Sequence, residues 1–180
     1  MRVVGGRHRG RRIEPPKGIE ARPTTDFAKE ALFNILQHSV PLEGIRVLDL
    51  FAGAGGISVE FLSRGAENVI SVERDRTLFA HLQRLARDLD EPGWQQVKAD
   101  VFTFLRGHRG KYDIVFADPP FALEAPERIP TLVFEAGLLE EDGLLILEHP
   151  GNVDHSATPG FREHRAYGSV HFSFLGTPRS

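Results

Sequence analysis

The chain contains no cysteine among its 180 residues, and its only methionine is Met1. The absence of cysteine excludes a disulfide framework, a thiolate metal site and a cysteine nucleophile. Lysine is also scarce, with 4 residues against 18 arginines, while proline occurs 12 times. A composition of this kind favours a heat-stable source.

Long apolar runs are absent as well. No stretch approaches the length of a membrane span, and the N-terminus lacks the apolar core of a secretory signal. We therefore expect a cytoplasmic protein with no membrane partner. The length and the 41% hydrophobic content are typical of one globular domain with a substantial core, and nothing in the sequence requires more than a monomer.

The net charge of −3 is unevenly distributed along the chain. Residues 1–22 carry seven basic side chains against two acidic ones, a net charge of +5, which leaves −8 for the remainder. A positive arm on an acidic body is typical of a protein that binds a polyanion such as nucleic acid, although a solvated tail has the same composition. The candidate residues for this contact are Arg2, Arg7, Arg9, Arg11, Arg12 and Arg22.

The arm also has a β-hairpin pattern, because Val3-Val4 and Arg12-Ile13 flank Gly5-Gly6 and Gly10. We therefore divide the chain into an arm, residues 1–22, packed with or appended to a main domain, residues 23–180. At the start of the main domain, Thr24 or Thr25 can cap a helix that runs to about residue 38.

From residue 45 onward, strands and helices alternate. This pattern predicts a doubly wound α/β domain with a mainly parallel, Rossmann-like sheet of about seven strands and an antiparallel C-terminal edge. The predicted strands are Ile45–Leu50, Val69–Glu73, Trp94–Lys98, Tyr112–Ala117, Leu144–Glu148, Arg162–Ala166 and Val170–Leu175. The predicted helices of this part are Gly56–Ser63, Arg76–Leu89, Val101–Leu105 and Glu127–Leu139.

Polar residues follow the first strands of this sheet, at the edge where such sheets bind ligands. Asp49 ends the first strand, and two glycines then allow close approach of the backbone to a ligand. Glu73 can bond ribose hydroxyls and Asp100 an adenine amino group, although Glu73 also suits a salt bridge and Asp100 a helix N-cap. The candidate cofactor-binding residues are Asp49, Gly53, Gly55, Glu73, Asp100 and Val101.

The type of ligand follows from Asp49 and Ser58. Ser58 stands where a dinucleotide-binding fingerprint needs glycine or alanine, and the Asp49 carboxylate is awkward beside a pyrophosphate. The same carboxylate suits an ammonium group. S-adenosylmethionine (AdoMet) carries an ammonium group, a ribose and an adenine, and it has no phosphate.

The tetrapeptide Asp118-Pro119-Pro120-Phe121 follows the fourth predicted strand. Two consecutive prolines exclude a helix and a central strand, so the chain must turn there. A carboxylate, rigid carbonyls and an aromatic face then share a small volume, which suits a flat ring that bears an amino group. The alternative is a plain Asp-Pro turn with a core phenylalanine.

Several of these segments together resemble the RsmD-type family of 16S ribosomal RNA guanine-N2 methyltransferases, within the class I AdoMet-dependent methyltransferases. The resemblance rests on Arg2–Gly6, Arg9–Arg11, Arg22–Asp26, Glu30–Asn34, Asp49–Gly56, Leu62–Ala66, Glu73 with Asp75, and Asp118–Phe121. It covers nearly the full length and thins after about Pro150. At Phe27-Ala28 the chain departs from the family, which usually has a basic residue there.

The resemblance implies methyl transfer from AdoMet to the exocyclic N2 of one guanine in 16S rRNA, the guanine-966 type of site. It implies that Asp118, Pro119 and Phe121 are catalytic and that the arm binds RNA. The partner would be 16S rRNA, the small ribosomal subunit or its assembly intermediate. No metal is implied, and the eight histidines show no pair at metal-ligand spacing.

Three alternatives remain open at this stage. The Asp-Pro-Pro-Phe motif also occurs in adenine-N6 methyltransferases of DNA or RNA, which usually carry a larger target-recognition domain. A nicotinamide-dependent oxidoreductase would leave Asp118–Phe121 without a function. A non-catalytic rRNA-binding factor would not need every acidic cofactor position to be filled.

Overall fold

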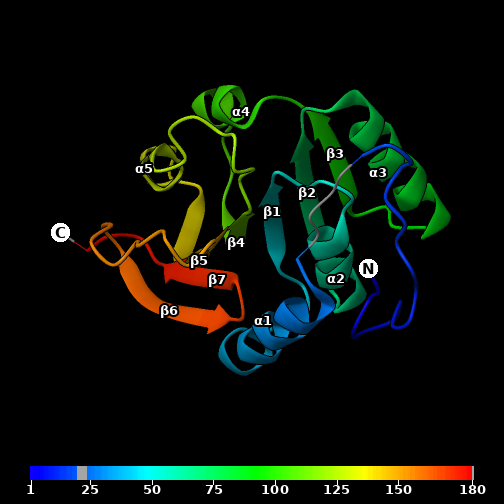
Figure 1. The fold of residues 1–180 in the computed structure, drawn as a ribbon, viewed down its shortest axis with the longest axis horizontal. Coiled ribbons are helices and arrows are strands. Elements are labelled where there is room, and N and C mark those ends of the chain that lie inside the picture. The colour runs from blue at the N-terminus through cyan, green and yellow to red at the C-terminus, as the bar shows by residue number, and fades with distance from the viewer. Residues whose placement is uncertain (20–23, 180) are drawn as a thin grey trace.

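A seven-stranded sheet in the order β3-β2-β1-β4-β5-β7-β6 forms the centre of the computed structural model, which describes residues 1–19 and 24–179 (Figure 1). Strands β1 to β5 pair in parallel, and β7 is antiparallel to both β5 and β6. This arrangement confirms the predicted doubly wound sheet with an antiparallel edge. The strands are β1 (Arg46–Leu50), β2 (Asn68–Glu73), β3 (Trp94–Lys98), β4 (Tyr112–Ala117), β5 (Leu139–His149), β6 (Phe161–Tyr167) and β7 (Val170–Leu175).

Helices cover both faces of the sheet. They are α1 (Asp26–Ser39), α2 (Gly56–Ser63), α3 (Arg76–Asp88), α4 (Val101–Gly107) and α5 (Arg128–Glu135). Successive residues of a strand point to opposite faces, so Val47 packs in the core with α1, α2 and α3, and Leu48 in the core with α4 and α5. None of the helices in the described part of the chain has the length and apolar character needed to span a membrane.

The boundary between α5 and β5 differs from the prediction. The helix predicted over Glu127–Leu139 ends at Glu135, and Gly137 follows in the left-handed region with φ +63°. β5 then begins at Leu139 rather than at Leu144, because Leu139 pairs with Tyr112 of β4. The Leu-Leu-Glu-Glu sequence continues a helical pattern, and the pairing with β4 overrides it.

The arm is less regular than the predicted hairpin. In its described part, one antiparallel bridge joins Arg2 and Arg12, and no pair of strands forms. The backbone N–H of Ile13 donates to the carbonyl of Met1 at 3.0 Å. Val3 and Ile13 are each only 1% exposed and belong to the main core. The two sides of the arm are therefore joined by a few backbone hydrogen bonds, among them that of the Val3 N–H to the Arg11 carbonyl at 2.9 Å, and two buried side chains anchor the arm in the core.

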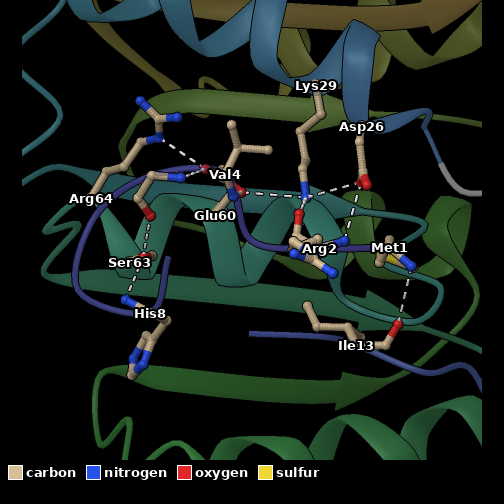
Figure 2. Close-up of polar contacts among 11 residues, drawn as sticks. Met1, Arg2, Val4, His8, Ile13, Asp26, Lys29, Glu60, Ser63 and Arg64 are labelled. Carbon is tan, nitrogen blue, oxygen red and sulfur yellow. Dashed lines mark hydrogen bonds and ion pairs between the residues drawn. The ribbon is translucent and has the colours of Figure 1, made fainter. Parts of the chain in front are cut away.

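A buried carboxylate holds the arm against α2 (Figure 2). Glu60 accepts hydrogen bonds from the backbone N–H groups of Val4, at 3.0 Å, and Gly5, at 2.9 Å. Lys29 of α1 and Arg64 form ion pairs with the same carboxylate, at 3.3 and 3.0 Å. Glu60 is fully buried, and these four partners compensate its charge.

The arm also closes the C-terminal end of α2. Ser63 presents a carbonyl that accepts the backbone N–H of Arg7 at 2.8 Å, and its hydroxyl accepts that of His8 at 2.9 Å. Gly6 makes this contact at φ +75°, where a Cβ atom would lie 1.9 Å from the Ser63 carbonyl oxygen. Only glycine fits there. The last turn of α2 is therefore one part of the docking surface of the arm.

Candidate active site

A cavity of about 880 Å³ opens at the carboxyl ends of the parallel strands. It lies where the strand order reverses between β1 and β4, which is the usual ligand site of doubly wound sheets. Its volume is within the range of small-molecule sites. Of the candidate cofactor-binding and catalytic residues, all but Gly55 line it: Asp49, Gly53, Glu73, Asp100, Val101, Asp118, Pro119 and Phe121.

The loop between β1 and α2 forms one wall of the cavity. Phe51 and Gly53 both have left-handed backbone conformations, with φ of 64° and 57°. The backbone N–H of Ala52 donates to the carbonyl of Val72, and that of Gly53 donates to Glu73 Oε2 at 2.9 Å. The loop is therefore tied to the end of β2 in an unusual backbone conformation, a feature common at binding sites.

Glu73 is held by backbone groups on both of its oxygens. Oε2 accepts from Gly53, and Oε1 accepts from the N–H of Asp75, both at 2.9 Å. No ion pair of Glu73 occurs within the described residues, so the salt-bridge alternative finds no support there. Each carboxylate oxygen keeps a second lone pair, which can accept a hydroxyl of a ligand.

Gly55 has a packing role instead of a lining one. It precedes α2 at φ +90°, and a Cβ atom there would lie 2.8 Å from Leu82 Cδ2 and 3.2 Å from the Trp94 ring. The glycine therefore lets the loop pack closely on α3 and β3.

Gly53 and Gly55 differ in the space that surrounds them, so an alanine at each position should affect thermal stability differently. We expect Gly55→Ala to lower the midpoint of thermal unfolding by more than Gly53→Ala, because a Cβ atom added to Gly53 would meet no atom within 4 Å. Backbone strain of about 1–3 kcal/mol is common to both variants, and the contact with Leu82 and Trp94 is added only at Gly55. Equal shifts of the two variants in a calorimetric scan would contradict the steric argument.

Asp100 caps a helix and also lines the cavity. Its Oδ1 accepts the N–H of Thr103 at 3.0 Å, which caps α4, so the N-cap alternative is confirmed. The residue nevertheless lines the cavity together with Val101. The hydrogen bond to Thr103 fixes the side chain at the cavity wall and engages only one of its two oxygens.

Three acidic residues meet at this edge of the sheet. The pairings Leu50↔Ala117 and Ala117↔Leu147 bring together the ends of three neighbouring strands. As a result Asp49 of β1, Asp118 after β4 and Glu148 of β5 all line the same cavity.

Burial raises the pKa of each acid in this cluster. The pKa of Asp49 is raised to about 7, although the hydroxyl of Ser58, which donates to it at 2.5 Å, opposes the shift. The pKa of Glu148 is also raised to about 7 by burial, against the effect of the hydroxyl of Thr24. The pKa of Asp118 lies well above its usual range through burial and the charges of Glu148 and Asp49. The cavity therefore favours ligands that bring positive charge or hydrogen-bond donors.

Glu148 was missing from the sequence-based set of site residues. The rule that identified Asp49, Glu73 and Asp118, namely a polar residue at the end of a parallel strand, applies equally to Glu148 at the end of the fifth strand. Thr24 was expected near the mouth of the pocket without an assigned role, and it lines the cavity. Its contact with Glu148 could not be foreseen, because the two residues are 124 positions apart in the sequence.

The Asp118–Phe121 turn lies on the rim of the cavity. The N–H of Leu123 donates to the carbonyl of Pro120 at 2.9 Å and closes a tight turn over residues 120–123, directly after the double proline. Phe121 is 70% exposed, so the alternative of a core phenylalanine is wrong. An aromatic face, the Pro119 backbone and the Asp118 carboxylate therefore border one opening.

The five described arginines of the arm, Arg2, Arg7, Arg9, Arg11 and Arg12, are all exposed. Arg7 also forms an ion pair with Glu91, with 3.0 Å between Nε and Oε1. Met1 reaches the cavity wall, so the arm borders the site directly. Arg22 lies outside the described residues. Within the described ranges, no three His, Asp or Glu side chains are arranged to hold a metal ion.

Comparison with known proteins places this geometry in a family. The family model described as conserved hypothetical protein 95 matches residues 1–176. The putative rRNA methyltransferase YlbH of Bacillus subtilis is 36% identical over 89% of this chain and 88% of its own. Ribosomal RNA small subunit methyltransferase D of Escherichia coli K12 is 33% identical over 82% of this chain and 74% of its own.

Solved structures agree with these relatives. The putative methyltransferase yhhF of Escherichia coli superimposes with a TM-score of 0.86 at 29% identity, over 100% of this chain and 99% of its own. The 16S rRNA N2 G1207 methyltransferase RsmC of Thermus thermophilus, solved with AdoMet and guanosine, shares the fold with a TM-score of 0.70 at 23% identity, over 90% of this chain and 46% of its own. The chain therefore belongs to the RsmD-type family of class I rRNA methyltransferases, the family described as conserved hypothetical protein 95.

Proposed function

We propose that this protein transfers a methyl group from AdoMet to the exocyclic N2 of one guanine in the 16S rRNA of the small ribosomal subunit. The observation that carries the proposal is the cavity that the acid cluster and the Asp118–Phe121 turn share. The name of the Escherichia coli relative, a small-subunit rRNA methyltransferase, supports the choice of RNA. The exposed arginines of the arm support it as well.

AdoMet is the methyl donor of class I methyltransferases, and the residues of the cavity fit it. In the proposed arrangement Asp49 faces the ammonium group, Glu73 accepts the ribose hydroxyls and Asp100 accepts from the adenine amino group. The acidic side chains that line the cavity disfavour a pyrophosphate and therefore a nicotinamide dinucleotide.

The Asp118–Phe121 turn handles the amino group of the base. The lone pair of guanine N2 is delocalised into the ring, which makes this nitrogen a poor nucleophile. Asp118 Oδ and the Pro119 carbonyl accept the two N–H groups and direct the lone pair towards the sulfonium methyl, about 3–3.5 Å away and in line. Phe121 stacks on the base.

The methyl transfer is a single displacement step. The N–C bond forms while the C–S bond breaks, and the sulfonium becomes a neutral thioether. The amino nitrogen loses one proton, which passes to the Asp118 carboxylate and from there to solvent. Before the reaction the guanine must leave any stacked helix, which costs a few kcal/mol and less if the base lies in a loop.

Incubation with labelled AdoMet and small subunits that lack the modification tests this function, followed by mapping of the labelled nucleotide. We expect label on the N2 of a single guanine, the guanine-966 type of site. Label on an adenine would favour the adenine-N6 alternative, and no label on either subunits or naked rRNA would favour a non-catalytic factor.

The pKa of Asp49 predicts how AdoMet affinity depends on pH. The ammonium group requires the charged carboxylate, and a pKa of about 7 means that this form falls from most of the protein at pH 8 to a minority at pH 6. We expect the AdoMet dissociation constant to increase roughly tenfold between pH 8 and pH 6. Equilibrium dialysis of the wild-type protein and Asp49→Asn checks this, since the variant should bind weakly with a flatter pH profile. A pH-independent constant in the wild type would contradict the role of Asp49.

A further inference from the structure

Glu148 and Thr24 both line the cavity, but neither takes part in the proposed methyl transfer. We propose that Glu148, held by the hydroxyl of Thr24, accepts a hydrogen bond from N1–H of the target guanine and thereby selects guanine over adenine. This inference rests on the proposed function, because it assigns the base specificity of the same site.

The sheet places Glu148 beside the amino-group site. Ala117 of β4 pairs with Leu147 of β5, so Asp118 and Glu148 follow at the same level of two adjacent strands. Neighbouring strands lie about 4.8 Å apart. Two carboxylates at this spacing can contact adjacent positions of one base edge: Asp118 the amino group at C2, and Glu148 the neighbouring N1–H.

The surroundings of Glu148 favour a ligand that donates hydrogen bonds. The residue is 8% exposed, and the hydroxyl of Thr24 donates to its Oε2. No ion pair compensates its charge within the described residues. A buried carboxylate is costly unless donors satisfy it, and Oε1 has no protein donor among the described groups. A hydrogen-bond donor on a bound base supplies the partner that Oε1 of Glu148 needs.

Thr24 fixes the orientation of this acceptor. Thr24 is itself buried. It directly precedes Thr25, the N-cap of α1, so the capped helix end fixes where the Thr24 backbone lies. With Oε2 held by Thr24, the carboxylate cannot rotate freely, and Oε1 keeps one direction. Thr24 therefore acts as a positioning residue and makes no contact with the base.

The chemistry of the two purines explains the selection. Guanine carries a hydrogen on N1, whereas N1 of adenine is an acceptor. A carboxylate that faces N1 of adenine would leave two acceptors in contact and both of them unsatisfied. Sites built to accept a hydrogen bond can reject analogues that lack the donor by factors on the order of 10⁴. The Asp-Pro-Pro-Phe turn makes no such distinction, because both bases offer it an amino group.

The test uses 2-aminopurine, which keeps the 2-amino group and has an unprotonated N1. Reconstituted small subunits would carry either guanine or 2-aminopurine at the nucleotide that the wild-type protein labels, and methyl transfer from labelled AdoMet would be measured on both. We expect the wild type to prefer guanine by about 100-fold, and Glu148→Gln to reduce this preference at least tenfold, because the amide can donate to N1 of 2-aminopurine. Glu148→Asp, which keeps the charge, should retain the preference at a lower rate.

Two controls separate this role from others. Thr24→Val should lower kcat/KM for guanine about tenfold with little change in AdoMet affinity, because the acceptor loses its orientation. An unchanged preference in Glu148→Gln would overturn the inference, and so would a more than tenfold loss of AdoMet affinity, which would assign Glu148 to the cofactor. If the wild type labels no guanine N2 at all, the proposed function itself fails.

Discussion

Asp118→Ala is expected to reduce methyl transfer by about 10³-fold, while the AdoMet dissociation constant stays within about threefold of the wild-type value. The proposed role of Asp118 is to accept an N–H of the target amino group, and loss of one fixed polar group in an active site commonly costs 10²–10³-fold in rate. The Asp118 side chain lines the cavity next to Pro119, whereas the cofactor contacts are assigned to β1, β2 and the start of α4. The substitution should therefore lower the rate of methyl transfer while AdoMet affinity stays nearly unchanged.

The matched control for this experiment is Asp118→Asn. The amide keeps one oxygen acceptor and nearly the same shape, and it removes the charge that takes up the proton. We expect a rate between those of the wild type and Asp118→Ala. Single-turnover transfer with saturating AdoMet measures the rate, and calorimetric titration measures the affinity. Near-wild-type turnover by Asp118→Ala would remove Asp118 from catalysis, and a parallel loss of AdoMet affinity would assign it to the cofactor.

The position of most site residues could be predicted without coordinates, for a physical reason. Parallel strands end at one edge of a sheet, so an acid after each strand must arrive at that edge whatever the details of packing. The prediction placed Asp49, Glu73, Asp100 and Asp118 there, and all four line the cavity. Gly55 does not line the cavity, and a glycine that faces a ligand looks the same in a sequence as one that lets the backbone pack on Leu82.

Contacts between distant segments could not be predicted in this way. The bond between Thr24 and Glu148 depends on how α1 approaches β5, and no local pattern specifies that approach. The arm posed the same problem: its glycines favoured a hairpin, and its docking on α2 determines its actual path. One signal was available, because Glu60 is the single charge in the otherwise apolar or small α2 segment Gly56–Ser63. A lone acid in such a helix requires a partner, although the sequence does not say which.

Glu60→Leu is expected to lower the free energy of unfolding by about 3–5 kcal/mol, the usual cost of breaking a buried ion pair from one side. The substitution leaves the ammonium group of Lys29 with the Arg2 carbonyl and with the more distant carboxylate of Asp26, at 3.9 Å, although the Lys29 side chain is only 2% exposed. It also removes the acceptor of the Val4 and Gly5 N–H groups (Figure 2). A domain of this size is stable by about 5–15 kcal/mol, so the loss is a large share of the total.

The same variant should release the arm locally before it unfolds the domain. Urea denaturation gives the global loss, and hydrogen exchange at the Val4 and Gly5 amides reports the arm. The control is Glu67→Leu, an exposed carboxylate just beyond the end of the same helix, which should stay within about 0.5 kcal/mol of the wild type. Unchanged protection of the two amides in Glu60→Leu would contradict the docking role of the carboxylate.

Release of the arm should also reach the cavity, because Met1 lines it and a Cβ atom on Gly56 would lie 2.4 Å from the Met1 sulfur. The first residue of the arm thus packs against the first residue of α2, next to the loop assigned to the cofactor. We therefore expect Glu60→Leu to weaken AdoMet binding even though Glu60 does not line the cavity. If AdoMet affinity stayed unchanged while the arm amides lost protection, arm docking and cofactor binding would be independent. A parallel loss of both would indicate that Glu60 joins the arm, for which we propose RNA binding, and the cofactor site into one cooperative unit.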